Sequence, residues 1–225
     1  MSLSNDPFDE LRRRNPWKKL RATPPYILDE DRVAIEQFNA TRARIETRIQ
    51  TDVVPEPFIG SPYASVWLLN LNPGFDETDL LHSSAVKEQQ LQSAYLNSTG
   101  FWYLGEQFSE TGGHRWWSRR LREAITEHGE NSIRHSLFCV EFFPYHSKTF
   151  DKRLFVASQK FTFDLVRRGI ELGKSFVFMR SVRAWNDAVS ELKGASSIQL
   201  KNPRSPYVTR RNLSDPHFRG CPVLC

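Results

Sequence analysis

Residues 64–75 read ASVWLLNLNPGF and join an apolar run to a compact turn signal. The run from Val66 to Leu69 is typical of a strand buried on both faces, as in parallel sheets. Pro73 fixes its φ and Gly74 tolerates positive φ, so the pair predicts a type II turn. Asn72 is then expected at the carboxyl edge of the strand, where open α/β sheets bind ligands. The alternative is that Asn-Pro-Gly serves only as a good turn.

Further apolar segments follow this one, and helical patterns separate them. Strands are expected at 136–142, 175–179 and 197–200, and helices near 84–96, 116–128, 151–172 and 182–192. Strands that alternate with helices predict a parallel sheet with helices on both faces. The expected fold class is therefore α/β, a three-layer α/β/α arrangement with a four-stranded parallel sheet.

The totals fit one soluble domain. The 225 residues are 39% hydrophobic and 25% charged, which is a globular composition. No repeat or long linker divides the chain, so 1–225 is expected to be a single domain, with an N-terminal helical extension at 1–58 and a core at about 60–212. Helices are expected around 9–20 and 29–50 in the extension. No apolar run can span a bilayer and the charged N-terminus does not resemble a signal peptide, so a cytoplasmic monomer is expected.

Basic residues gather in short groups, and the formal net charge is +5. This charge permits nucleic-acid binding without requiring it. The alternative for most of these groups is a solvated helix face. The groups are 12–14, 18–19, 119–120, 167–168 and 210–211.

The carboxyl ends of parallel strands meet at one edge of the sheet, so four loops are expected to converge there. They comprise residues 70–75, 143–147, 180–183 and 202–211, and two of them contain an Asn-Pro pair. Asn72 and Asn202, far apart in sequence, are therefore expected to face one cleft.

Three short motifs carry a family resemblance: LNLNPGF at 69–75, GHRWW at 113–117 and NPRSP at 202–206. In this order they resemble the uracil-DNA glycosylase superfamily, closest to its mismatch-specific and single-strand-selective branches. The resemblance covers about 60–212. It implies hydrolysis of the N-glycosidic bond of a damaged or deaminated base in single- or double-stranded DNA, with no metal or other cofactor. Asn72 matches the asparagine that positions the attacking water, and Asn202 opens the second motif.

The same resemblance suggests roles for other residues. Asparagine can orient water but cannot take its proton near neutral pH, which suits Asn72. The base is expected to contact the backbone around Leu71, Gly74 and Phe75, and Tyr145 either covers the base or packs a loop. Phosphates and neighbouring bases are expected to meet the last loop, through Arg204, Ser205, Tyr207, Arg210 and Arg211.

Glu141 departs from the pattern. It stands three residues before Pro144, where single-strand-selective enzymes carry an asparagine that reads the uracil edge. An ionised glutamate only accepts hydrogen bonds and would repel uracil O4, so either a base with an exocyclic amine or a protonated glutamate is expected. Arg204 also separates Pro203 from Ser205. These departures leave open a catalytically inactive member of the fold that binds nucleic acid or a nucleotide.

Other candidate residues have ordinary alternatives. His146 either stabilises an anionic base or is a surface histidine. Asp76 and Glu77 either act as general bases in a nucleotide hydrolase or favour the start of a helix. Trp117 is expected in the core and Trp116 at the surface. Cys139 is expected in the core, and Cys221 and Cys225 form a solvated tail rather than a metal site.

Overall fold

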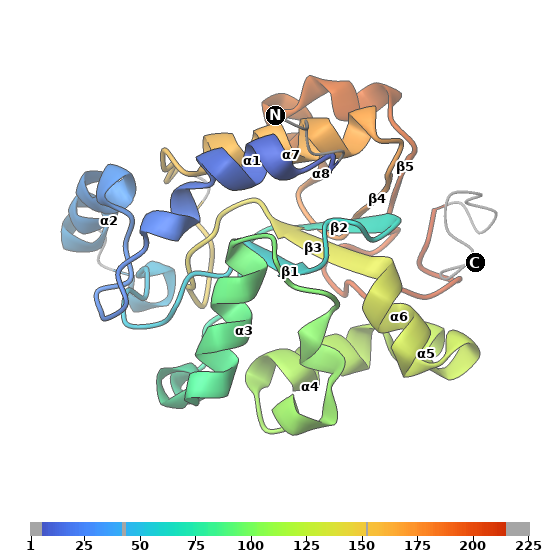
Figure 1. Cartoon of the computed structure of the whole chain (residues 1–225), viewed down its shortest axis with the longest axis horizontal. Coiled ribbons are helices and arrows are strands. Elements are labelled where there is room, and N and C mark those ends of the chain that lie inside the picture. The colour runs from blue at the N-terminus through green and yellow to red at the C-terminus, as the bar shows by residue number, and fades with distance from the viewer. Residues whose placement is uncertain (1–5, 42–43, 152, 215–225) are drawn as a thin grey trace.

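The computed structural model describes residues 6–41, 44–151 and 153–214. Its sheet has five strands in the order β1-β3-β2-β4-β5 (Figure 1). They are β1 (Phe58–Gly60), β2 (Val66–Asn70), β3 (Leu137–Glu141), β4 (Ser175–Phe178) and β5 (Ser197–Gln199). β2 pairs in parallel with β3 and β4, and β4 pairs in parallel with β5, whereas β1 is antiparallel to β3.

The sheet is therefore mixed: the four expected strands are parallel to one another, and the antiparallel strand β1, which was not expected, makes it five-stranded. The missed strand β1 has only three residues and follows Pro55 and Pro57. Prolines cannot donate to a ladder, so this segment resembles a loop in the sequence. Its first residue, Phe58, lies opposite Val140 of β3.

Helices cover both faces of the sheet. Trp67, Phe138 and Phe176 belong to one apolar cluster, and Leu68, Cys139 and Val177 belong to another, as period-2 alternation along the strands requires. Figure 1 shows α1, α7 and α8 on one side and α4, α5 and α6 on the other. The described helices are α1 (Asp9–Arg14), α2 (Asp29–Thr41), α3 (Ser84–Ala94), α4 (Gly112–Arg120), α5 (Arg122–His128), α6 (Glu130–Ser136), α7 (Gln159–Glu171) and α8 (Val182–Ala188).

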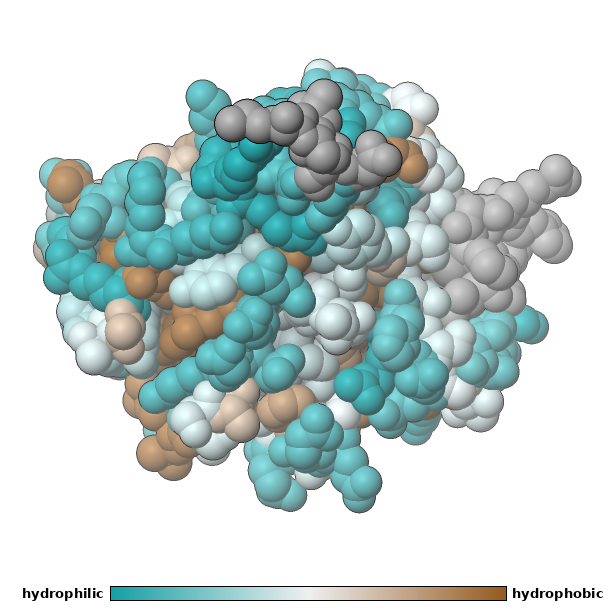
Figure 2. Space-filling model, in the orientation of Figure 1, coloured by the Kyte–Doolittle hydropathy of each residue, from teal (hydrophilic) through white to brown (hydrophobic). Residues whose placement is uncertain are grey.

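None of the helices in these described ranges combines the length and the apolar character needed to cross a membrane. The face shown in Figure 2 is mostly hydrophilic, with hydrophobic residues recessed between hydrophilic ones.

Several helices are shorter than their patterns predicted. The 9–20 segment divides into α1 and a 3-10 turn (Pro16–Lys19), because proline disfavours a continuous helix through the residues before it. In the segment expected at 29–50, α2 ends at Thr41 and a separate 3-10 helix spans Ile45–Thr47. The 116–128 segment is two helices, α4 and α5, which meet at Leu121.

The N-terminal residues belong to the main core. Phe8, Trp17 and Ile35 are fully buried in the same cluster as Trp67 of β2. Asp31 of α2 is also buried, and it accepts hydrogen bonds from Tyr145 Oη at 2.7 Å and from the Ser158 backbone at 2.9 Å. The segment from Phe8 to Ile35 therefore forms part of the core.

The segment after β2 is not a type II turn, since Gly74 does not have positive φ. Residues Asn72 to Asp76 instead lead into a 3-10 helix (Glu77–Leu81) that carries a capping box. The Asp76 carboxylate accepts from the Thr78 backbone at 3.0 Å, and Asp79 accepts from the Asp76 backbone at 2.8 Å. These two carboxylates thus stabilise a helix start.

Candidate functional site

A cleft of about 440 Å³ opens at the carboxyl edge of the sheet. Its walls come from the ends of β2, β3 and β4 and from α4, so three of the four expected loops do converge. The residues that line it include Glu56, Asn70, Asn72, Gly74, Phe75, Asp79, Tyr103, Arg115, Trp116, Arg119, Arg120, Glu141, His146, Ser147, Lys148 and Arg180.

Asn72 lines the cleft with its amide held in one orientation. Its Nδ2 donates to the Pro73 carbonyl at 2.8 Å, to Ser147 Oγ at 3.1 Å and to the Ser147 carbonyl at 3.3 Å. Three acceptors around one nitrogen fix the amide assignment. The amide oxygen is the remaining polar atom, so Asn72 offers the cleft a hydrogen-bond acceptor.

Glu141 and Asn70 lie side by side in register at the ends of β3 and β2. Both line the cleft and are nearly inaccessible, with 2% and 5% exposure. Asn70 Nδ2 donates to Glu141 Oε1 at 2.9 Å. Burial raises the pKa of Glu141 to about 8, although Asn70, Cys139 and the charge of Arg180 act in the opposite direction. The carboxyl is therefore mainly protonated at neutral pH.

The proton of Glu141 has one open position. Oε1 already accepts from Asn70 and, at 3.7 Å, from Cys139 Sγ, so the hydroxyl is Oε2. Neither Glu141 Oε2 nor Asn70 Oδ1 has a hydrogen-bond partner among the described residues. The pair therefore leaves one donor and one acceptor unpaired, both on buried atoms. Of the two expected alternatives for Glu141, burial favours the protonated glutamate.

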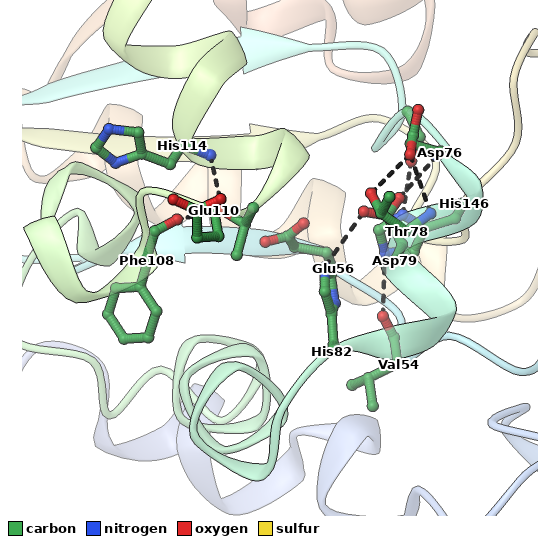
Figure 3. A network of polar contacts seen from close by, with 12 residues as sticks. Val54, Glu56, Asp76, Thr78, Asp79, His82, Phe108, Glu110, His114 and His146 are labelled. Carbon is green, nitrogen blue, oxygen red and sulfur yellow. Dashed lines mark hydrogen bonds and ion pairs between the residues drawn. The ribbon is translucent and has the colours of Figure 1, made fainter.

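Glu56 is a second buried carboxyl in the cleft, and no sequence pattern pointed to it because it stands between two prolines. Tyr103 Oη donates to Glu56 Oε2 at 3.0 Å, whereas Oε1 has no partner in the described part of the chain. Burial raises the pKa of Glu56 well above its usual value, and the nearby Glu141 and Asp79 raise it further. Figure 3 shows Glu56 close to Asp79, His82 and His146.

His146 is buried, so the expectation of a surface histidine is wrong. Its Nδ1 lies 2.6 Å from the Gly74 carbonyl and its Nε2 lies 3.1 Å from the Val54 carbonyl (Figure 3). Burial lowers the pKa of His146, and Asp79 and the two carbonyls oppose that effect. With both ring nitrogens facing backbone, His146 ties the Asn72 loop to the segment before β1.

Phe75 and Gly74 line the cleft as expected, and Lys148 Nζ lies 5.9 Å from the centre of the Phe75 ring. Leu71 and Tyr145 do not line it. Leu71 packs on the apolar core. Tyr145 is fully buried and bonded to Asp31, so the prediction that it covers a base is wrong and its alternative, packing a loop, holds.

Asn202 does not line the cleft, so the prediction that Asn202 faces Asn72 is wrong. β5 lies two strands away from β2, roughly 10 Å across the sheet. Asn202 is exposed, and its Oδ1 accepts from the Ser205 backbone at 3.4 Å. Arg210 pairs with Glu127 of α5 at 3.2 Å. None of the residues of this loop that were expected to bind DNA lines the cleft. They are Arg204, Ser205, Tyr207, Arg210 and Arg211.

Other cationic side chains line the cleft instead: Arg115, Arg119, Arg120, Lys148 and Arg180. We refer to them as the rim of the cleft. The Arg120 guanidinium lies 4.3 Å from the ring centre of Trp116 and 5.2 Å from that of Tyr207. Tyr207 thus contacts the rim through Arg120. The pairing of Arg119 with Arg120 was visible in the sequence, but their place beside Arg180 was not.

No group of three or more His, Cys, Asp or Glu side chains in the described residues has a geometry that could hold a metal ion. Cys139 is buried, and Cys221 and Cys225 lie outside the described residues. A scan against models of protein families, a search of curated proteins and a search of solved structures each found no match to this chain.

Proposed function

We propose that this protein is a divergent member of the uracil-DNA glycosylase fold that hydrolyses the N-glycosidic bond of a damaged or deaminated base in DNA. One observation carries the proposal: the same cleft is lined by Asn72, whose amide is held in a fixed orientation, and by Glu141 and Asn70, which each have one polar atom without a hydrogen-bond partner among the described residues. The Asn72 amide oxygen is suited to bind a water molecule, and the Glu141 and Asn70 side chains are suited to bind the edge of a base.

The base edge meets a donor and an acceptor. Protonated Glu141 donates to a ring carbonyl, and Asn70 Oδ1 accepts from the neighbouring ring N–H. Uracil, hypoxanthine and xanthine carry this carbonyl and N–H combination, which deamination creates. The proton on Glu141 removes the repulsion that an ionised glutamate would exert on uracil O4. Phe75 supplies an aromatic face at the cleft on which the base stacks.

Bond cleavage leaves an oxocarbenium-like sugar and an anionic base. Asn72 Oδ1 accepts a hydrogen bond from the attacking water and orients it, without taking its proton. The Glu141 hydroxyl strengthens its hydrogen bond as negative charge develops on the base carbonyl. The target nucleotide must first leave the base stack, which costs a few kcal/mol.

A second candidate is a module of the same fold that binds nucleic acid without cleaving it. The observation in its favour is that the two carboxylates that follow the Asn72 turn are both engaged: Asp76 caps a helix and Glu77 pairs with Lys148 at 3.4 Å. The same contacts argue against a nucleotide hydrolase that uses these two residues as bases.

The test is incubation with oligonucleotides that each carry one uracil, hypoxanthine, xanthine or alkylated base, scored for abasic sites by alkaline strand cleavage. Asn72→Ala is expected to lower the single-turnover rate by about 100-fold, the scale of losing one positioned polar group. Asn202→Ala is the matched control, because this exposed asparagine lies outside the cleft, and its rate should equal that of the wild type.

A single-turnover rate of Asn72→Ala equal to that of the wild type would refute the catalytic assignment. Absence of product on every lesion, with DNA still bound, would favour the binding module. Absence of both product and DNA binding at low salt would refute both candidates.

A further inference from the structure

Three arginines from two elements meet at the rim of the cleft. Arg119 and Arg120 end α4, and Arg180 lies two residues after the end of β4. The Nε atoms of Arg120 and Arg180 are buried and have no acceptor among the described residues. A buried guanidinium donor without an acceptor is energetically unfavourable, so an anionic group at this rim would be stabilising.

Several other arginines of the described residues are ion-paired and provide a contrast. Arg167 pairs with Asp164 and Glu191, Arg168 with Glu171, Arg183 with Asp187 and Arg210 with Glu127. No carboxylate in the described residues lies within 4.0 Å of the guanidinium nitrogens of Arg119, Arg120 or Arg180. Arg119, Arg120 and Arg180 therefore line the cleft without a neutralising carboxylate from the described residues.

The three charges act on one another. The pKa of Arg120 is lowered first by burial, and the like charges of Arg119 and Arg180 lower it further. Arg180 also acts electrostatically on Glu141 at the floor of the cleft. The cationic rim is therefore continuous with the proposed base-binding floor.

Arg120 is held in place before any ligand arrives. Its guanidinium contacts the rings of Trp116 and Tyr207, at 4.3 Å and 5.2 Å from their centres. Such cation–π contacts restrict the guanidinium while its N–H groups stay available to an oxygen ligand. A preorganised guanidinium loses less conformational entropy when it binds.

We propose that Arg119, Arg120 and Arg180 form a phosphate-binding site, which holds a backbone phosphodiester of the nucleic-acid strand whose base enters the cleft. Several guanidinium groups match the distributed charge of phosphate oxygens, and the site adjoins the floor that takes the base. The inference rests on the proposed function only for the identity of the cleft as a base site. It replaces the phosphate contacts expected from Arg204, Arg210 and Arg211.

The test measures binding and not cleavage. A 5′-fluorescein-labelled single-stranded 15-mer of thymidylate contains no lesion, and its fluorescence anisotropy gives Kd between 25 and 300 mM NaCl. Arg119→Gln and Arg180→Gln are each expected to weaken binding several-fold at low salt. Removing one arginine–phosphate ion pair should also reduce the slope of log Kd against log salt by about 0.7.

Matched variants separate this site from general surface charge. Arg183→Gln and Arg210→Gln remove the same charge from ion-paired arginines outside the cleft and should leave the Kd near that of the wild type. Arg119 is exposed, so its replacement tests the site without disturbing packing. Equal weakening by all four variants, or none by Arg119→Gln and Arg180→Gln, would overturn the proposal.

Equilibrium dialysis with deoxyuridine monophosphate and with deoxyuridine identifies the source of the phosphate. Arginine-dependent binding of the monophosphate, without binding of the 15-mer, would assign the site to a free nucleotide and overturn the nucleic-acid assignment. Binding of the 15-mer that depends on these arginines supports the phosphate-binding site, even if no lesion yields product. Absence of product on every lesion would refute the glycosylase activity and leave the phosphate-binding site supported. If Arg119→Gln and Arg180→Gln change neither product formation nor DNA binding, the phosphate-binding site is refuted and the proposed glycosylase activity is not.

Discussion

Glu141 is charged in the usual form of its side chain and neutral in this fold. The apolar run that precedes it predicted its place at a strand end, near Asn72. Its protonation was not predictable from that run, because it depends on burial by β1 and the segment before it. The Glu141 backbone N–H, for example, donates to the Pro57 carbonyl at 2.9 Å. Local pattern thus located the residue, whereas tertiary contacts decided its chemistry.

The raised pKa of Glu141 predicts a pH-dependent stability. The unfolded chain releases this proton near the ordinary glutamate value of 4.5, and the folded chain retains it to about 8. The stability contributed by Glu141 is therefore complete below pH 4.5 and falls by about 1.4 kcal/mol per pH unit until the folded pKa is passed. Urea unfolding of wild type and Glu141→Gln between pH 5 and 9 measures it.

Glutamine keeps the acceptor for Asn70 and a donor at the open position, but does not titrate. The difference in unfolding free energy should move in favour of Glu141→Gln as pH rises to about 8, and then level off. Parallel pH profiles for the two proteins would contradict the buried, protonated state.

At the scale of elements, α4 illustrates what periodicity misses. Apolar spacing predicted a helix from residue 116, with Trp117 in the core, and Trp117 is buried. The helix begins earlier, at Gly112, because Thr111 Oγ1 accepts from the His114 backbone at 3.0 Å. Gly112 and Gly113 have poor helix propensity, so the apolar pattern did not predict a helix start there. The Thr111 N-cap stabilises that start.

The two glycines of α4 provide a matched pair. A Cβ at Gly113 would lie 2.1 Å from the Tyr103 ring, whereas a Cβ at Gly112 meets its nearest atom at an ordinary 3.6 Å. Gly113→Ala should destabilise the protein by about 1–3 kcal/mol, the usual range for overpacking. Gly112→Ala should be neutral or stabilise by up to about 1 kcal/mol, as alanine favours a helix.

Thermal and urea unfolding of both variants check this prediction. Because Tyr103 also donates to Glu56, Gly113→Ala is expected to disturb the cleft as well as the core. Equal stabilities for the two alanine variants would contradict the close packing of α4 on Tyr103.

At the scale of the whole molecule, alternation of strands and helices was predictable, and so was a cleft at the carboxyl edge. The spatial order of the strands was not, since no local pattern says which strand takes the edge. This is why residues 202–211 were expected in the cleft, although β5 lies beyond β4. The short strand β1 was missed for a local reason, its proline-rich approach.

The buried N-terminal residues predict that the chain folds as one unit. Deletion of residues 1–57 removes Phe8, Trp17 and Ile35 from the core and exposes the apolar surface that they cover. Each such loss costs several kcal/mol, against a total stability of about 5–15 kcal/mol. The truncated chain should show no cooperative thermal transition by circular dichroism.

Tyr145→Phe is the milder companion to this deletion. It leaves the buried Asp31 without one donor and should cost about 1–3 kcal/mol while the protein still folds. A cooperative transition in the truncated chain, or an unchanged stability in Tyr145→Phe, would contradict the joint core.

The environment of Asn72 also limits how this site can evolve. Its nitrogen faces two carbonyl oxygens and the Ser147 hydroxyl, which itself donates to the Thr149 carbonyl at 3.2 Å. An aspartate at position 72 has the same shape, but its second oxygen would face two backbone carbonyls, and Ser147 could donate to it only by giving up its hydrogen bond to the Thr149 carbonyl. A stronger proton acceptor therefore cannot arise here by the smallest substitution, because the surrounding backbone would have to be rebuilt with it.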